Sequence, residues 1–273
     1  MKIKSSSHSL GVQRELKDSQ KEVADSSLNL ASGKRINKAS DDAAGFSQAA
    51  NSNADLRSKG QANRNANQAI GILQVGEGAI NVMVNMVTRM RELAVQSASD
   101  TIGSGERYSL NLEVDRMKSE IHRISESTTY NGIKIFSGEE RKLDFQIDSG
   151  NGKKDKIQLN LKDMAQSPYA LGIFDVSVDS KLHANLSIYK LDSALSELEK
   201  SRAKLGSINN RITSVIDKLN TDQYNISTYK SKIEDADIAY EKSRNMKAQM
   251  QAKTQNFVAS YVNLDPNAAL KLL

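Results

Sequence analysis

The side chains best suited to chemistry are scattered along this chain of 273 residues. The three histidines, His8, His122 and His183, share no ligand spacing, and cysteine is absent. Without cysteine, disulfides, thiolate nucleophiles and zinc–thiolate sites are excluded. Asp235 and Asp237 are paired carboxylates, but two positions apart on a helix they point in different directions. We interpret them as the acidic, solvent-facing start of a helix and not as a metal site.

Two glycine-containing patterns partly match the spacing of known binding loops. Counted from Asp148, the ligand positions of an EF-hand fall on Gly150 and Gly152, which offer no side-chain oxygen, so a turn is predicted there. Gly-x-Gly also occurs at 76–78, 103–105 and 150–152. None of these follows a strand and opens a helix, so no dinucleotide site is implied. The sequence therefore predicts no catalytic residues, no metal and no cofactor, and a protein that is not an enzyme.

The composition favours thin helical layers or a polymer over a thick globular core. Hydrophobic residues make up 38% of the chain, aromatic residues only 5%, and tryptophan is absent. A core completed between subunits would suit so few large apolar side chains. The two prolines, Pro168 and Pro266, lie outside the helical patterns, so long helices are permitted.

The charge pattern argues against nucleic acid, and the hydropathy pattern against membrane insertion. The net charge is +5, but 38 Lys and Arg are interspersed with 33 Asp and Glu, without a basic run. No segment approaches the roughly 20 apolar residues of a membrane span. Residues 1–14 lack the apolar core of a cleaved Sec signal peptide. On their own, these observations would suggest a cytoplasmic protein.

Helical periodicity dominates both ends of the chain. In the C-terminal half an apolar seam with steps of three and four is interrupted only by Arg202 and Asn209. A seam of the same spacing occupies the helix expected over 106–127. Such seams need partner helices, and the economical partner is the other end of the same chain. The seam positions are Ile188, Leu191, Leu195, Leu198, Leu205, Ile212, Ile216 and Leu219, and Leu110, Val114, Met117, Ile121 and Ile124.

Three further helices are expected. The first thirty residues form a weakly amphipathic helix, with a half-polar seam that would order only on assembly. Residues 40–42 look like a cap for a helix that runs to about residue 99. The last helix spans about 236–264 and carries Met250, Phe257 and Leu264 every seven residues. The long C-terminal helix begins near residue 182 and is expected to loosen at 221–228, where polar residues cluster.

The period changes from about 3.6 to 2 only in the middle of the chain. Leu143, Phe145 and Ile147 alternate with polar residues, as do Ile157, Leu159 and Leu161, and a polar glycine-containing stretch separates the two runs. This pattern predicts a β-hairpin. Residues 130–132 signal a turn, and 173–178 one short strand. The predicted fold is mainly α: an elongated helical bundle or coiled coil, formed by pairing of the N- and C-terminal segments, with a small central β-hairpin region.

Five stretches, in order along the chain, resemble motifs of bacterial flagellins. Residues 31–45, ASGKRINKASDDAAG, resemble SSG-x-RIN-x-A-x-DDAAG, and 89–97, RMRELAVQS, resemble R-x-RELAVQ. Residues 129–134, TYNGIK, are similar to an F-NG-x-K turn. Residues 201–212, SRAKLGSINNRI, resemble R-x-x-LGA-x-x-NR-L, and 231–241, SKIEDADIAYE, resemble S-x-I-x-DAD-x-A-x-E. The chain is thereby identified as a member of this family in a short form that lacks the outer variable domains.

The resemblance implies three regions. Residues 1–40 plus 232–273 would form an inner terminal-helix domain that is the filament core. Residues 41–136 plus 180–231 would form a helical rod domain, and 137–179 its β-hairpin region. Motif residues expected to pack this framework are Arg35, Asn37, Asp41, Asp42, Arg202, Leu205, Asn209, Arg211, Asp235 and Asp237. The closing Leu264, Leu270, Leu272 and Leu273 would be a terminal assembly and export segment, although Asp265 and Lys271 beside them, like the polar residues 1–8, are unusual for the innermost layer.

The resemblance also implies a function and partners. The chain would polymerise with copies of itself into the flagellar filament for motility. It would be secreted by the flagellum's own type III-like apparatus, with an export chaperone and without a cleaved Sec signal, and would meet filament cap and junction proteins. Arg89, Leu93 and Glu113 match a surface read by a flagellin-sensing innate immune receptor, and also suit ordinary subunit contacts.

Two alternatives stay open at this stage. A hook–filament junction protein shares the terminal helical architecture, although the RELAVQ and DAD matches favour flagellin. A cytoplasmic coiled-coil adaptor or nucleic-acid-binding protein is suggested only by the pI of about 9.1.

Overall fold

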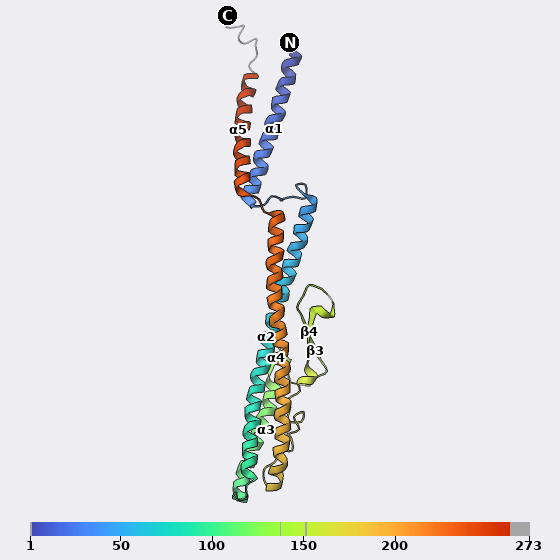
Figure 1. The fold of residues 1–273 in the computed structure, drawn as a ribbon, viewed down its shortest axis with the longest axis vertical. Helices are drawn as coiled ribbons and strands as arrows, with labels where there is room; N and C mark the ends of the chain where they lie inside the picture. Colours follow the sequence, from blue (N-terminus) through green and yellow to red (C-terminus); the bar gives the residue numbers. More distant parts are fainter. Residues whose placement is uncertain (1, 137, 151, 263–273) are drawn as a thin grey trace. The chain divides into compact units, whose positions relative to one another are not determined.

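The computed structural model describes residues 2–136, 138–150 and 152–262, and nearly all of its regular structure is helical. Within that part, five α-helices flank two short hairpins (Figure 1). The mainly-α class expected from the sequence is confirmed. The elements are α1 (Lys2–Ser32), α2 (Ala43–Ser97), α3 (Ser104–Ser127), β1 (Thr129–Tyr130), β2 (Ile133–Lys134), β3 (Lys142–Gln146), η1 (Lys153–Asp155), β4 (Lys156–Asn160), η2 (Leu161–Met164), α4 (Lys181–Glu234) and α5 (Ile238–Val262).

The chain divides into two compact units. Unit 1 comprises residues 1–56 and 224–273, and unit 2 comprises 57–223. Helices α2 and α4 each contribute residues to both units. The three domains drawn from the sequence describe layers of an assembly, whereas these units describe contacts inside one chain. The domain boundaries therefore stay a prediction.

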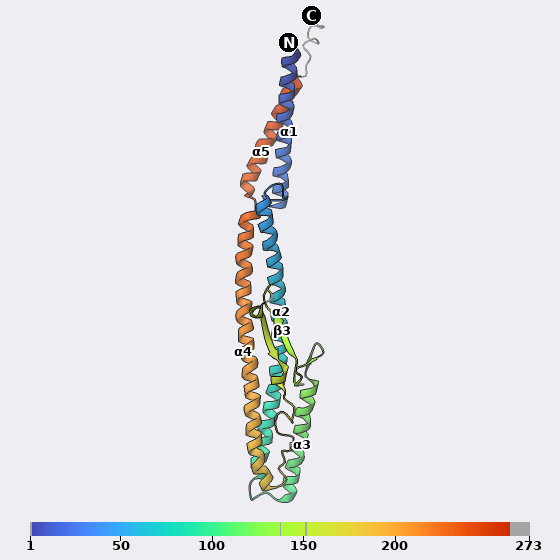
Figure 2. The same cartoon turned by 90° about the vertical axis from the view of Figure 1, so that its right-hand side faces the viewer.

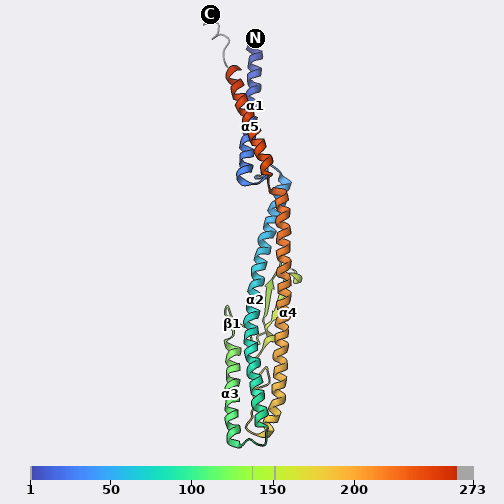
Figure 3. The same cartoon turned by 60° about the vertical axis from the view of Figure 1, so that its left-hand side comes forward.

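Unit 1 pairs the two ends of the chain. Helices α1 and α5 lie side by side and antiparallel in all three views (Figures 1, 2 and 3). This confirms the pairing of the N- and C-terminal segments. Ile36, in the connection before α2, and Ala49, in the first turns of α2, are both buried, and with Lys230 and Glu234 of α4 they line one small pocket.

Unit 2 is a helical bundle with one continuous apolar core. Figure 3 shows α3 and α4 on opposite flanks of α2. The predicted seams meet there, because Val114, Ile121, Leu191, Leu198 and Ile212 are all buried in one cluster. The core also holds Ile135 and Phe136, which directly follow β2 and are among the largest fully buried side chains. Helical spacing therefore identified the buried faces correctly.

The predicted central hairpin is confirmed. Strands β3 and β4 pair antiparallel, with Leu143 opposite Leu159 and Phe145 opposite Ile157. Leu143, Ile157 and Leu159 are buried, so one face of the ladder packs on the helical core, as period-2 alternation requires.

The turn predicted at 130–132 is a second, smaller hairpin. Tyr130 pairs with Ile133, and Asn131 and Gly132 have φ values of 48° and 77°. Two positive φ angles in a two-residue loop are the geometry that Asn-Gly supplies at least cost. The sequence located the turn but not the strands β1 and β2 beside it, because each has only two residues.

Two local predictions were wrong. Residues 173–178 form no strand. The amides of Ile173 and Val176 close turns within the loop, and Val178 N donates to the side chain of Asn111 on α3 at 2.8 Å. Helix α4 does not loosen at 221–228 but is continuous to Glu234. Intrahelical hydrogen bonds need no apolar seam, and polar side chains such as Thr221, which donates to Asp217 O at 2.9 Å, fit a solvated helix.

The prediction that no segment is apolar enough to span a membrane needs a correction for one helix. Helix α2 contains one 18-residue window of mean hydropathy 1.4, so by length and composition alone it could cross a membrane. A core helix of a bundle passes the same test, and a third of this window (33%) is buried within the structure. The window is therefore weak support for a membrane span.

Candidate assembly surfaces

The connections between helices in unit 1 are built from the two acidic motifs. Asp42 caps α2, accepting the Gly45 amide at 2.9 Å, and Asp237 caps α5, accepting the amides of Ala239 and Tyr240 at 2.9 and 3.0 Å. Asp41 accepts the amides of Asn37 and Lys38 instead, and these backbone bonds lower its pKa. Three of the four motif aspartates thus act as caps or turn acceptors.

The same motifs hold the two connections to each other. Arg35 N donates to Glu234 O at 2.7 Å, and Ala236 N donates to Gly33 O at 3.0 Å. The guanidinium of Arg35 adds a bond to Ile233 O at 2.8 Å, and Lys34 pairs with Glu234. The fourth aspartate, Asp235, lies in this bridge, opposite Lys34. The structure therefore brings Arg35 and Asp235 together, although they are 200 residues apart in the chain.

Helices α1 and α5 meet through small and polar side chains. Asn245 is buried and donates to Val23 O at 3.2 Å, Ser26 Oγ at 2.8 Å and Ser27 Oγ at 2.9 Å. Around it, Arg244 pairs with Glu22 at 2.8 Å, and Asn29 donates to Glu241 at 3.2 Å. Asn37, another motif residue, donates to Asn29 Oδ1 at 2.8 Å. The other side chains buried along this contact are Ser19, Ser26, Glu241 and Ala248.

The large apolar side chains of α5 face the opposite way. Met246 is 49% exposed, Met250 is 63% exposed, and Phe257 also lies at the surface. At 100° per residue these three positions share one face, roughly opposite the buried Glu241, Asn245 and Ala248. The predicted seven-residue seam of α5 therefore exists, but it does not face α1. Leu264, its third member, lies outside the described residues.

The motif residues of α4 have different roles. Leu205 is buried against α2, where a Cβ on Gly76 would come within 3.3 Å of its Cδ1, so the glycine permits this close approach. Arg202 and Arg211 are exposed, and Arg202 lies 3.9 Å from both Glu77 and Glu199. Asn209 is half-buried. Among these four residues only Leu205 packs in the core.

The predicted surface at Arg89, Leu93 and Glu113 is only partly a surface. Arg89 bridges α2 and α3, with Nε 3.1 Å from Glu113 and Nη1 3.1 Å from Glu92. The hydrogen bonds that this exposed guanidinium donates to Glu92 and Glu113 raise its pKa. Leu93, however, is 1% exposed and lies in the apolar core. Helical spacing alone could have separated it, because Leu93 follows the buried Met83, Val87 and Met90 at steps of three and four.

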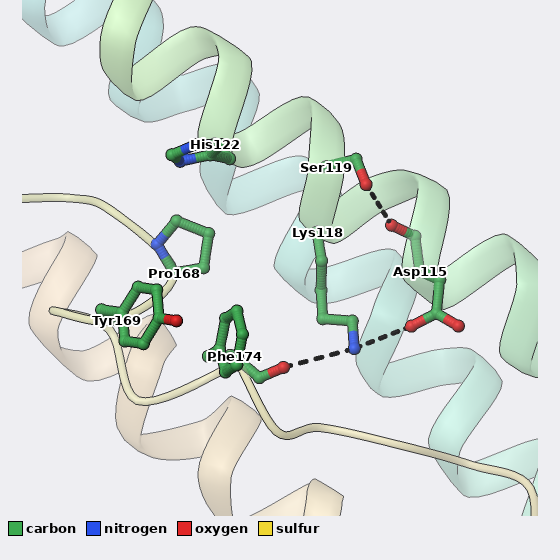
Figure 4. Close-up of a pocket in the computed structure, with 7 residues that line it drawn as sticks. All are labelled: Asp115, Lys118, Ser119, His122, Pro168, Tyr169 and Phe174. Carbon is green, nitrogen blue, oxygen red and sulfur yellow. Dashed lines mark hydrogen bonds and ion pairs between the residues drawn. The ribbon is translucent and has the colours of Figure 1, made fainter.

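Sequence reasoning missed a groove between α3 and the loop that precedes α4. The groove has a volume of about 420 Å³ and is open to the surface (Figure 4). On one side it is lined by α3, and on the other by an aromatic pair on the loop. Its lining residues are Asp115, Lys118, Ser119, His122, Pro168, Tyr169 and Phe174. The sequence signal was two aromatic residues, Tyr169 and Phe174, in a short loop that contains Pro168, but no periodic pattern covers this loop.

The two ends of the chain match one family. The family model described as the bacterial flagellin N-terminal helical region matches residues 3–141, and the model of the C-terminal helical region matches 188–273. The chain belongs to the bacterial flagellin family. A flagellin is a structural subunit of the flagellar filament, and the resemblance inferred from the five motifs is confirmed.

Two curated relatives match over nearly their whole length. A flagellin of Halalkalibacterium halodurans is 30% identical over 244 residues, which cover 89% of each chain. A flagellar filament 33 kDa core protein of Treponema phagedenis is 28% identical over 277 aligned positions, which cover 96% of each. Relatives of about this length therefore exist, as expected for a short flagellin.

Solved structures agree on the fold. The crystal structure of Bacillus cereus flagellin has a TM-score of 0.51 at 26% identity and covers 57% of this chain and 88% of its own. A protein described as flagellar hook-associated, from Vibrio parahaemolyticus, has a TM-score of 0.59 over 71% of this chain. Its identity is only 12%, so that likeness concerns the fold alone. The flagellin assignment is therefore preferred to the junction protein.

Proposed function

We propose that the outward apolar face of α5 is a principal contact by which this filament subunit packs against its copies. The observation that carries the proposal is the inverted polarity of unit 1: the α1–α5 contact is polar, whereas Met246 and Met250 are largely exposed. Burying such side chains is favourable by about 25 cal/mol per Å² of apolar surface. A copy that covers this face supplies the cohesion that the isolated pair lacks, in a heterologous contact that repeats without closing.

The three sequence-derived regions fit this assembly. Residues 1–40 plus 232–273 are the inner domain, residues 41–136 plus 180–231 the rod, and residues 137–179 its hairpin region. The boundary at residue 40 falls in the non-helical connection 33–42 after α1, whereas the boundary at residue 232 falls in the last turn of α4, just before the connection 235–237. In this proposal Leu264, Leu270, Leu272 and Leu273, which lie outside the described residues, extend the assembly surface and take part in export.

Export as an unfolded chain suits the weak α1–α5 contact. The Oε2 atom of Glu241 is buried without a hydrogen-bond partner among the described residues, and such a group opposes folding. An easily separated terminal pair and a chain without cysteine favour passage through a narrow export channel. We propose export by the flagellum's own apparatus with a dedicated chaperone, without a cleaved Sec signal, followed by contacts with cap and junction proteins.

Of the surface predicted to bind a flagellin-sensing innate receptor, we propose that only the exposed pair of Arg89 and Glu113 takes part. The bonded guanidinium and carboxylate are half-exposed and cross from α2 to α3. Leu93 drops out of this proposal because its side chain is not accessible.

A polymerisation assay tests the main proposal. Met246→Gln combined with Met250→Gln keeps side-chain length but removes apolar surface, and we expect at least a tenfold higher critical concentration for filament growth. Lys247→Gln with Gln251→Ser, both exposed on a different face of α5, is the matched control and should assemble like the wild type. Normal assembly of the methionine variant would contradict the proposal. Wild-type growth that stops at short caps in electron micrographs would favour the junction protein instead.

A further inference from the structure

The loop between η2 and α4 is held rigidly from within. Its residues Ile173, Val176 and Val178 are fully buried in the core of unit 2. Its backbone is closed by a turn in which Ile173 N donates to Pro168 O at 2.9 Å. A loop fixed by this many buried side chains keeps one conformation before and after any contact.

Helix α3 fixes the same loop from outside. Lys118 Nζ donates to Val176 O at 2.7 Å and to Phe174 O at 3.4 Å, and it pairs with Asp115 at 2.7 Å (Figure 4). Because the ammonium and the carboxylate satisfy each other, these two charges in the groove are matched. The groove therefore suits an uncharged apolar surface better than an anion or a nucleic acid.

Two aromatic side chains stand outward on this rigid support. The rings of Tyr169 and Phe174 stack with centroids 4.1 Å apart and planes 18° from parallel. They are nevertheless 70% and 56% exposed. An aromatic side chain buries about 150–250 Å² in all, and more than half of each of these residues is still exposed to a partner. Docking costs little side-chain entropy because the pair is already ordered. This combination is typical of an interface anchor.

A complementary feature lies on another face of unit 2. Leu182, Leu186 and Tyr189 form an exposed stripe on the first turns of α4, at spacings of four and three. Such spacing is how a helix presents anchors to a groove. The groove lies between α3 and a loop that is itself tied to α4 by the Lys190–Asp175 pair. The stripe lies on the side of α4 turned away from the buried Ala184 and Leu191, and α3 and α4 lie on opposite flanks of α2 (Figures 2 and 3). A contact between two different faces joins copies head to tail, which is the kind of contact that can repeat along a filament.

We propose that the α3–loop groove binds a second copy of this chain through that copy's Leu182–Leu186–Tyr189 stripe. The inference rests on the filament function and adds a contact in unit 2 to the one proposed for α5. Residues 137–179, which the sequence predicted only as the hairpin region of the rod, then carry part of an assembly contact.

Cysteine pairs give a direct test, since the chain has no cysteine of its own. Ser119→Cys lies in the groove and Leu186→Cys in the stripe, and filaments of the double variant should oxidise to a ladder of covalent multimers. The control pair, Ser119→Cys with Ser214→Cys, places the second thiol on an exposed position farther along α4 and should give no ladder. Equal cross-linking of both pairs, or of neither, overturns the proposal.

Removal of the aromatic anchor is the second test. Tyr169→Ala with Phe174→Ala should raise the critical concentration for assembly at least tenfold, with an unchanged circular dichroism spectrum. Tyr169→Phe keeps the stacked pair and should assemble like the wild type. If the alanine variant assembles at the wild-type concentration, the groove is not a contact, while the filament function and the α5 proposal stand. If the wild type forms no filaments, both proposals fall.

Discussion

The amide nitrogen Nδ2 of Asn245 lies 2.8 Å from Ser26 Oγ, at the centre of the contact between α5 and α1. The same nitrogen reaches Val23 O and Ser27 Oγ, and Asn245 Oδ1 accepts Gln249 Nε2 at 2.7 Å. A satisfied amide inside a helix pair specifies one register, because any shift leaves it buried and unpaired. This polar contact positions the two ends of the chain and leaves their apolar faces for assembly.

Asn245→Ala should therefore weaken unit 1 in particular. We expect a loss of about 1–3 kcal/mol, since buried acceptors on α1 lose their donor. Hydrogen exchange of α1 and α5 amides measures the effect, with the amides of unit 2 as an internal reference. Asn256→Ala changes an exposed asparagine of the same helix and should stay within about 0.5 kcal/mol of the wild type. Equal exchange in both variants would show that the amide does not hold the pair.

A second prediction concerns the ionic cluster that ties the β3–β4 hairpin to two helices. Lys59 of α2 lies 2.9 Å from Asp222 of α4 and 3.5 Å from Asp148 at the end of the hairpin. Burial opposes the charge on Lys59, but the bonds and fields of Asp222 and Asp148 outweigh it and raise its pKa. The pKa of Asp148 is lowered, first by the bond from Ser149 N and then by Lys59 and Lys218.

These shifts fix the direction of the pH dependence. A carboxyl group with a depressed pKa in the folded state stabilises above its unfolded pKa of about 3.9, and this contribution is lost as the pH falls through the lower folded value. A lysine with a raised pKa stabilises below about 10.4, and loses this contribution as the pH rises through the higher folded value. The charges of the Lys59–Asp148–Asp222 cluster should therefore contribute their full stabilisation between about pH 5 and pH 9.

Asp148→Asn tests the acid side. At pH 7 the hairpin amides should exchange faster, because the variant loses about 1 kcal/mol of protection. When the pH is then lowered below 4, the protection of these amides should not decrease further. Asp144→Asn, on the exposed face of β3, is the control and should keep the wild-type acid profile. If Asp148→Asn loses hairpin protection in acid as the wild type does, Asp148 is not the titrating group.

Sequence patterns located the helices and the hairpin because burial imposes a period on them, and the buried Leu143 and Leu191 follow those periods. The sequence did not predict which partner each apolar helix face packs against. Met250 and Phe257 have the spacing of a seam, yet the chain packs α5 through Asn245 and Ser26. Periodicity identifies an apolar face but not whether the same chain or a neighbour covers it. The Tyr169–Phe174 groove had no periodic signal, since irregular backbone positions both rings.

A third prediction separates glycine's two roles in α2. A Cβ on Gly45 would lie 2.5 Å from Asp42 Oδ2 and 2.6 Å from Ile36 Cδ1, so alanine must displace the helix cap or a buried side chain. We expect Gly45→Ala to destabilise unit 1 by about 1–2 kcal/mol. Gly78 has nothing within 4 Å, so Gly78→Ala should stabilise α2 by about 0.5–1 kcal/mol through helix propensity. Thermal unfolding of both variants should move in opposite directions, and a shared direction would refute the cap argument.

The last prediction separates surface from core at the RELAVQ motif. Arg89→Ala removes ion pairs whose side chains are about half-exposed, and such pairs contribute about 0–1 kcal/mol. Leu93→Ala opens a cavity in the apolar cluster of unit 2 and should cost about 2–5 kcal/mol. Urea unfolding measures both. If Arg89→Ala alters binding to an innate receptor or a neighbouring subunit, it should do so at unchanged stability. Any effect of Leu93→Ala on such binding should instead disappear under conditions in which the variant is fully folded. A Leu93→Ala variant as stable as Arg89→Ala would mean that Leu93 is not the core residue that its burial indicates.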